Sequence, residues 1–148
     1  MSDSGDRTYG GDISVEEAWS SLRSDPAAVL IDVRTEAEWT FVGVPDLSSI
    51  DKQTLLVSWN TFPPNQPQTD FIERLDAALG AQSIGKDAPL FFLCRSGQRS
   101  QSAAIVATQA GYAGCFNVVE GFEGPLGPER HRGTKGSWKA EGLPWKQS

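Results

Sequence analysis

The chain has 148 residues, of which 39% are hydrophobic and 9% are aromatic, and this size and composition fit one domain with a compact core. A fibrous, disordered or membrane-embedded class is excluded, because no apolar stretch approaches the roughly 20 residues that a membrane span needs. The formal net charge of −6 argues against nucleic acids and anionic membrane surfaces as partners, since both favour broad positive surfaces.

The first third of the chain predicts a lead-in, a helix, a strand and a second helix. Residues 1–11 are polar and rich in glycine, which indicates a flexible lead-in rather than a signal peptide. Apolar side chains spaced three and four apart predict a helix over residues 14–23, and the apolar run at 28–33 is typical of a strand buried on both faces. A short helix is expected over 35–41. Both helices begin with a possible capping box, formed by Ser14 with Glu17 and by Thr35 with Glu38.

The same alternation continues in the rest of the chain. We expect strands over 55–59, 89–93 and 115–119, a helix over 69–79 that Gly80 can end, and a helix over 98–110 that stops at Gly111. Strands that alternate with helices are the pattern of a parallel sheet covered on both faces. We therefore predict an α/β fold with a mostly parallel sheet of about five strands, in which residues 12–148 form a single domain.

The last part of that domain, residues 120–148, has a different composition. It is rich in glycine and proline and contains the single histidine of the chain, His131. We expect a largely irregular segment that tryptophan and leucine side chains pin to the domain, namely Trp138, Leu143 and Trp145. A solvated or packing role is favoured for His131 over a catalytic one.

A chemically distinctive loop follows the strand predicted at 89–93. Cys94 stands between that strand and the next helix, where unpaired amide groups and the helix dipole favour an anion. Arg95 and Arg99 add positive charge, and Gly97 allows a tight turn. These features favour the thiolate, the nucleophilic form of cysteine. The candidate catalytic residue is Cys94, and the candidate binding residues for a substrate or a persulfide are Arg95, Ser96, Gly97, Gln98, Arg99 and Ser100.

Some of these residues have a second interpretation. Arg95 either faces the substrate or points to solvent, and Ser96 and Ser100 either line the loop or only cap the helix. Cys115 begins an apolar strand, so core packing is favoured over a redox role.

Two further side chains, Asp32 and Arg34, come at the end of another buried strand, where ligands bind in parallel sheets. They either tune the Cys94 thiolate or pair with each other and support the site, and we favour support. Glu38 is interpreted as a capping residue rather than as a general acid.

The loop resembles that of the rhodanese family, which runs Cys-x-x-Gly-x-Arg followed by a small hydroxyl residue. Cys94, Gly97, Arg99 and Ser100 match it. Four residues separate Cys94 from Arg99, one fewer than in the related phosphatases. The resemblance covers about residues 12–146, because two other segments match the family: Leu30–Thr35 with Glu38 and Trp39 upstream, and Val118–Gly121 with Gly142–Pro144 at the end.

The chain also departs from the family. Gly43-Val44-Pro45-Asp46 lacks the histidine that many members carry there. Residues 125–137 look like an insertion relative to compact members, placed where it could shape the mouth of the site.

The resemblance implies a rhodanese-like fold and a sulfurtransferase that moves sulfane sulfur through a Cys94 persulfide. It implies a small anionic donor such as thiosulfate or a persulfide, a thiol or protein acceptor, and no metal or organic cofactor. We expect a cytoplasmic monomer with reduced thiols. Two alternatives stay open: a phosphatase or arsenate reductase on the same fold, and a non-catalytic interaction module.

Overall fold

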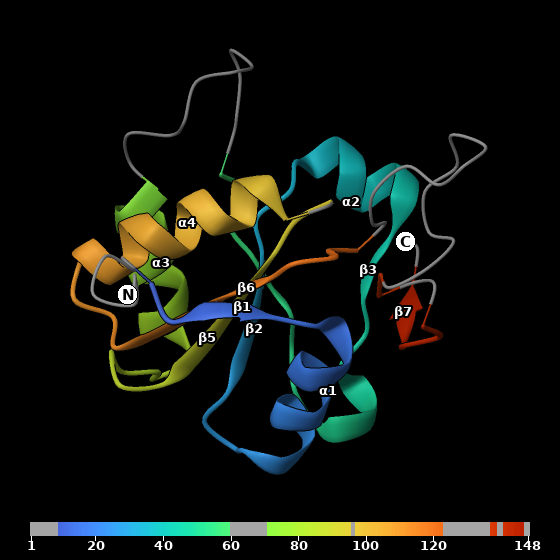
Figure 1. The fold of residues 1–148 in the computed structure, drawn as a ribbon, viewed down its shortest axis with the longest axis horizontal. Coiled ribbons are helices and arrows are strands. Elements are labelled where there is room, and N and C mark those ends of the chain that lie inside the picture. The colour runs from blue at the N-terminus through green and yellow to red at the C-terminus, as the bar shows by residue number, and fades with distance from the viewer. Residues whose placement is uncertain (1–8, 60–70, 96, 123–136, 139–140, 147–148) are drawn as a thin grey trace, which may run out of the picture.

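The central sheet of the molecule is parallel and has five strands (Figure 1). The computed structural model describes residues 9–59, 71–95, 97–122, 137–138 and 141–146. The strands are β1 (Gly11–Ile13), β2 (Val29–Asp32), β4 (Leu55–Leu56), β5 (Pro89–Leu93) and β6 (Gly114–Val118). They are arranged in the order β1-β6-β5-β2-β4, and every neighbouring pair is parallel. This arrangement confirms the predicted α/β fold with about five strands.

Helices cover both faces of the sheet (Figure 1). They are α1 (Val15–Ser24), α2 (Glu36–Val42), α3 (Phe71–Ala81) and α4 (Gln98–Gln109), with a short 3-10 helix at Ser48–Ile50. Alternate strand residues divide the core into two clusters: Ile31 and Phe92 pack with α3 and α4, whereas Leu30 and Leu93 pack with α1. This alternation follows from the period of two along a strand. In the part of the chain that the structure describes, no helix has the length and apolarity to cross a membrane.

Helix starts agree well with the sequence prediction. The capping boxes of α1 and α2 are both formed, by Ser14 with Glu17 and by Thr35 with Glu38. The end of α3 differs, because the helix continues through Gly80 to Ala81. The chain turns only at Ser83, which has a positive φ of 59°.

Two short strands of the central sheet differ from the sequence prediction: β1 was not predicted, and β4 is shorter than predicted. β1 begins at Gly11, inside the segment expected to be a lead-in. Three residues centred on Asp12 carry too little apolar periodicity to indicate a strand. The strand expected over 55–59 is reduced to β4, although amides of Val57 and Trp59 still donate to the carbonyl groups of Asp32 and Val33.

The C-terminal segment adds a small antiparallel sheet, in which β7 (Trp145–Lys146) pairs with β3 (Val44–Pro45). Trp138 is fully buried, and its indole N–H donates to the Pro144 carbonyl at 2.6 Å. Trp138 also packs in the core cluster that contains α1 and meets the Trp19 ring edge-on, so the predicted pinning by Trp138 is confirmed. Trp145 is 41% exposed and contacts the Phe122 ring edge-on.

Candidate active site

The cysteine loop lies at the carboxyl edge of the sheet. Cys94 directly follows β5, and α4 begins at Gln98. Because β5 lies between β6 and β2, side chains near the ends of those two strands flank the loop. This is the position at which parallel sheets bind ligands.

The sulfur of Cys94 is enclosed by the start of α4. Cys94 is only 1% exposed. The Gly97 N–H donates to its Sγ at 3.1 Å, and the Ser100 Oγ lies 3.3 Å from the same sulfur. A backbone amide and a hydroxyl group within reach of one sulfur provide donors for a negative charge.

Glycine is required at two positions that shape this loop. Gly97 has a φ of +110°, and a side chain there would overlap the carbonyl oxygen of Val119. Gly121 has a φ of +67°, and a side chain there would overlap the carbonyl groups of Cys94 and Arg95. The Phe122 amide also donates to the Cys94 carbonyl at 2.8 Å. The segment after β6 thus packs its backbone against the loop, which explains why Gly121 belongs to the closing motif found in the sequence.

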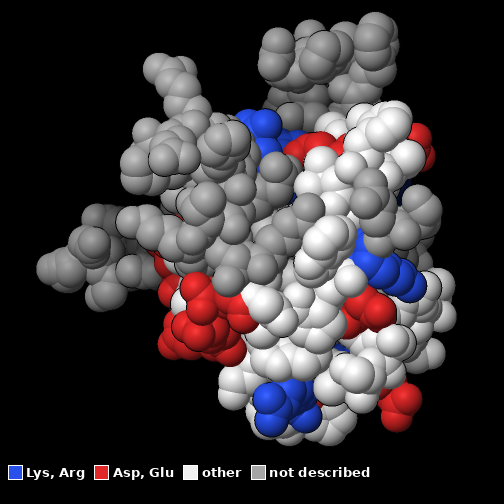
Figure 2. All heavy atoms as spheres, turned by 90° about the vertical axis from the view of Figure 1, so that its right-hand side faces the viewer, with Lys and Arg blue, Asp and Glu red and all other residues white. Residues whose placement is uncertain are grey.

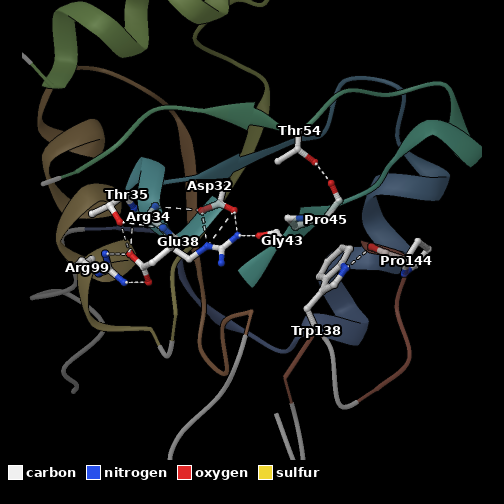
Figure 3. A network of polar contacts seen from close by, with 10 residues as sticks. All are labelled: Asp32, Arg34, Thr35, Glu38, Gly43, Pro45, Thr54, Arg99, Trp138 and Pro144. Atoms are coloured by element: carbon white, nitrogen blue, oxygen red, sulfur yellow. Dashed lines mark hydrogen bonds and ion pairs between the residues drawn. The ribbon is translucent and has the colours of Figure 1, made fainter. Parts of the chain in front are cut away.

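Arg99 does not point freely at the sulfur, because it forms a two-pronged ion pair with Glu38 (Figure 3). The distances are 2.7 Å from Nη1 to Oε1 and 2.9 Å from Nη2 to Oε2. Burial opposes the charge on both groups, but the pairing outweighs it: it raises the pKa of Arg99 and, with the hydrogen bonds from Thr35, lowers the pKa of Glu38 to about 2. Both groups are therefore charged across the physiological pH range.

Glu38 has two contacts at once, since the same carboxylate closes the capping box of α2 and holds Arg99. The capping role predicted for it is confirmed, and the ion pair to Arg99 was not predicted. Sixty-one positions separate the two residues in the sequence, so local pattern carries no signal for the pair.

Asp32 and Arg34 form a second, fully buried ion pair beside the loop (Figure 3). Arg34 Nη2 donates to Asp32 Oδ2 at 2.6 Å and to the Gly43 carbonyl at 2.7 Å. The guanidinium also stacks on the Phe122 ring at 4.2 Å. Asp32 and Arg34 therefore pair with each other, as one of the two sequence interpretations expected, and the pair ties the end of β2 to α2 and to the segment after β6.

One buried polar residue at the site was missed. Asn117 lies on β6, is 3% exposed, and accepts a hydrogen bond from Ser100 Oγ at 2.5 Å. Its own amide nitrogen donates to Asp12 Oδ1 at 3.1 Å. The available signal was an asparagine inside an otherwise apolar strand, because a buried polar side chain needs a partner.

The structure describes only some of the remaining candidate site residues. Arg95 is exposed. Gln98 is the first residue of α4, and its side chain lies outside the described part, as do Ser96 and His131. Cys115 is buried in the core, and burial raises the pKa of its thiol. This environment agrees with the packing role expected for Cys115.

Comparisons with known proteins find relatives that the chain spans almost completely and others that are much longer. A family model described as the STR4 middle domain matches residues 10–148. The uncharacterized protein RP600 homolog of Rickettsia rickettsii is 39% identical over 129 residues, which are 87% of this chain and 91% of that protein. The chloroplastic rhodanese-like domain-containing protein 4 of Arabidopsis thaliana is 23% identical, and the match spans 25% of its length.

Solved structures show the same architecture. The crystal structure of Rv0390 from M. tuberculosis superposes with a TM-score of 0.84 at 48% identity, covering 95% of this chain and 99% of that one. The polysulfide-sulfur transferase homodimer of Wolinella succinogenes superposes with a TM-score of 0.60 at 21% identity, covering 93% and 78% of the two chains. At that identity, the likeness concerns the fold alone.

Proposed function

The chain belongs to the family of the STR4 middle domain and has a rhodanese-like fold, and on that premise we propose that it is a sulfurtransferase with Cys94 as its nucleophile. The substrate is a small anionic donor of sulfane sulfur, such as thiosulfate or a persulfide. The acceptor is a thiol, either a small molecule or a side chain of a partner protein. The expected cytoplasmic location and monomeric state belong to this proposal.

One observation carries the proposal: the Cys94 sulfur lies at the start of α4 and receives the Gly97 N–H at 3.1 Å. An amide donor and the positive end of a helix dipole both favour a negative charge at this point. They act on the thiolate before reaction and on the anionic persulfide after it. Cys115, by contrast, is buried in the core, where its thiol lies 3.8 Å from the Tyr112 carbonyl oxygen, an acceptor.

In the first step, the Cys94 thiolate attacks the outer sulfur of thiosulfate. A new S–S bond forms to Cys94, the S–S bond of the donor breaks, and sulfite leaves with the electron pair. The enzyme then holds a persulfide whose charge lies on the outer sulfur. This is nucleophilic catalysis with a covalent intermediate.

In the second step, an acceptor thiolate attacks the outer sulfur of the persulfide. The acceptor gains that sulfur, the Cys94–S bond to it breaks, and the Cys94 thiolate is restored. Cyanide can replace the thiol acceptor in an assay and is converted to thiocyanate. Because the donor product leaves before the acceptor reacts, ping-pong kinetics are expected.

Arg99 contributes to this site as half of a neutral pair. Glu38 balances its charge, so the loop amides rather than a free arginine are the main contacts for the reacting sulfur. On the face that carries α2 and the small sheet, Lys and Arg side chains appear as separate spots beside Asp and Glu (Figure 2). We attribute anion binding to the local donors at the loop, because the described residues of this face form no continuous positive patch.

The direct test is the intact mass of the protein after incubation with thiosulfate. We expect a gain of one sulfur atom that cyanide or dithiothreitol reverses. Cys115→Ser should gain the same mass, whereas Cys94→Ser should not. Sulfur uptake that persists in Cys94→Ser would contradict the proposal. Hydrolysis of an aryl phosphate that depends on Cys94 would indicate a phosphatase instead, and an intact loop that takes up sulfur from no donor would indicate an interaction module.

A further inference from the structure

Two arginines lie beside the Cys94 loop, and a carboxylate pairs with each of them (Figure 3). Glu38 holds the Arg99 guanidinium through two hydrogen bonds of 2.7 and 2.9 Å. Asp32 holds Arg34 at 2.6 Å, and this second pair is fully buried. Each pair has a net charge of zero, so neither arginine presents an unbalanced positive charge to a ligand.

The groups that contact the Cys94 sulfur are uncharged. They are the Gly97 N–H at 3.1 Å and the Ser100 hydroxyl at 3.3 Å. Among the described residues of the loop, Arg95 is the remaining cation, and it is exposed, so water and salt screen its charge. The site therefore attracts an anion through dipoles and supplies little full positive charge.

Donors of sulfane sulfur differ in the charge that they bring to such a site. Thiosulfate carries two negative charges, whereas a simple organic persulfide carries one. The repulsion between a donor and the Cys94 thiolate rises with the product of their charges. The net charge of −6 of the chain adds a repulsion of longer range that is again larger for a dianion. A singly charged donor therefore fits this site better than thiosulfate does.

We propose that the donor for Cys94 is an organic persulfide with a single negative charge, and that Glu38 is a specificity-determining residue because it balances Arg99. This inference rests on the proposed function and chooses between the two donors named there. The Cys94 thiolate attacks the outer sulfur of RS–S⁻, a new S–S bond forms to Cys94, and the S–S bond of the donor breaks. RS⁻ leaves with the electron pair, and the negative charge of the outer sulfur stays on the Cys94 persulfide.

Glu38 acts on the donor through Arg99, whose charge reaches the reacting sulfur. Burial lowers the pKa of Arg99, but the hydrogen bond and charge of Glu38, followed by the charges of Cys94 and Asp32, raise it. Glu38→Gln removes the balancing charge, whereas the glutamine oxygen still accepts from Arg99 and closes the capping box of α2. The variant therefore leaves a charged and unbalanced guanidinium beside the loop.

The experiment compares how fast two donors load Cys94 with sulfur. The donors are thiosulfate and the persulfide of 2-mercaptoethanol, in which the terminal sulfur is the only group that carries charge. A rate constant for each donor is taken from the intact mass of the protein at a series of times, with Cys94→Ser as the blank. The readout is the ratio of the two rate constants within one variant, because a change in the thiolate fraction of Cys94 affects both donors alike and cancels.

The wild type should load faster from the persulfide than from thiosulfate. In Glu38→Gln, attraction to the unbalanced Arg99 should speed loading from thiosulfate about tenfold. Because this attraction is proportional to the charge of the donor, loading from the persulfide should rise only about threefold, and the ratio shifts about threefold toward thiosulfate. Glu36→Gln is the matched control, because Glu36 is exposed in the same helical turn, and its ratio should stay within about 1.5-fold of the wild type.

Each contrary result has a separate meaning. Faster loading of the wild type from thiosulfate would overturn the persulfide as the donor. A ratio that is unchanged in Glu38→Gln, or that shifts toward the persulfide, would overturn the role of Glu38, and so would an equal shift in Glu36→Gln. Loading from neither donor would refute the proposed function and this inference with it, whereas loading from both donors with an unchanged ratio would overturn this inference alone.

Discussion

The ion pair between Glu38 and Arg99 can be removed without disturbing the helix that carries it. Glu38 stands at the third position of α2 and closes the capping box with Thr35, and glutamine can close the same box. Glu38→Gln therefore removes one charge and the pair to Arg99, while the start of α2 keeps its hydrogen bonds. The variant isolates what the pair contributes.

The size of the effect follows from the pKa of Glu38. Burial would raise that pKa, but the hydrogen bonds and charge of Arg99, with the bonds from Thr35, lower it from 4.5 to about 2. At about 1.4 kcal/mol per pKa unit, this shift corresponds to about 3 kcal/mol before screening. The two side chains are 21% and 19% exposed, so water screens the pair, and we expect a loss of about 1–2 kcal/mol at neutral pH.

The pH dependence has a definite sign. Because the pKa of Glu38 is lower in the folded than in the unfolded protein, the carboxylate stabilises the fold fully above a pH of about 4.5. This contribution is lost as the pH falls toward about 2. The difference in unfolding free energy between wild type and Glu38→Gln should therefore shrink across this interval.

Urea unfolding followed by tryptophan fluorescence, at a series of pH values, measures that difference. Glu17→Gln is the matched control, because Glu17 closes the equivalent capping box of α1, and its described hydrogen bonds are those of that box. It should cost less than about 0.5 kcal/mol. Equal losses in the two variants, or a Glu38→Gln difference that stays constant down to a pH of about 2, would refute the reasoning.

Three further predictions concern the loop, the buried ion pair and the C-terminal segment. Gly97→Ala should reduce the rate of sulfur uptake from thiosulfate about tenfold, because the loop has to shift and its amide leaves the Cys94 sulfur. Asp32→Ala should lower the unfolding free energy in urea by about 3–5 kcal/mol, since it leaves the Arg34 guanidinium buried and unbalanced. Trp138→Ala should cost about 3–5 kcal/mol in the same assay, because a fully buried indole is lost.

Each of these has a control. Gly80→Ala is the control for the loop, because a side chain at Gly80 meets no atom within 4 Å and should leave sulfur uptake unchanged. Trp145, which is 41% exposed, is the control for Trp138, and its replacement by alanine should cost clearly less. Uptake at the wild-type rate in Gly97→Ala, or equal losses for the two tryptophans, would contradict these expectations. If Asp32→Ala lowered the unfolding free energy by less than about 1 kcal/mol, the Arg34 guanidinium would have to reach solvent when Asp32 is absent, contrary to the prediction.

The sequence was sufficient for the elements that carry strong local patterns. The apolar run of β5 and the 3-4 spacing of α1 indicate their type directly, and the capping residues Ser14 and Thr35 mark where two helices begin. Cys94 was identified for the same reason, because its setting between a buried strand and a helix start is a local feature. Short strands were harder to predict from the sequence. β1, β3 and β7 have two or three residues each, and their pairing depends on the partner strand rather than on their own composition.

The partners of the site residues were decided only by the tertiary structure. Arg99 carries the same charge in any conformation, but the fold brings Glu38 to it from another helix and makes the pair neutral. Ser100 has the same hydroxyl in any context, but the fold brings Asn117 and the Cys94 sulfur within hydrogen-bond distance of it. A sequence shows which groups can donate, accept or carry charge. The parallel sheet brings together groups from distant parts of the chain, and this proximity determines which of those interactions form.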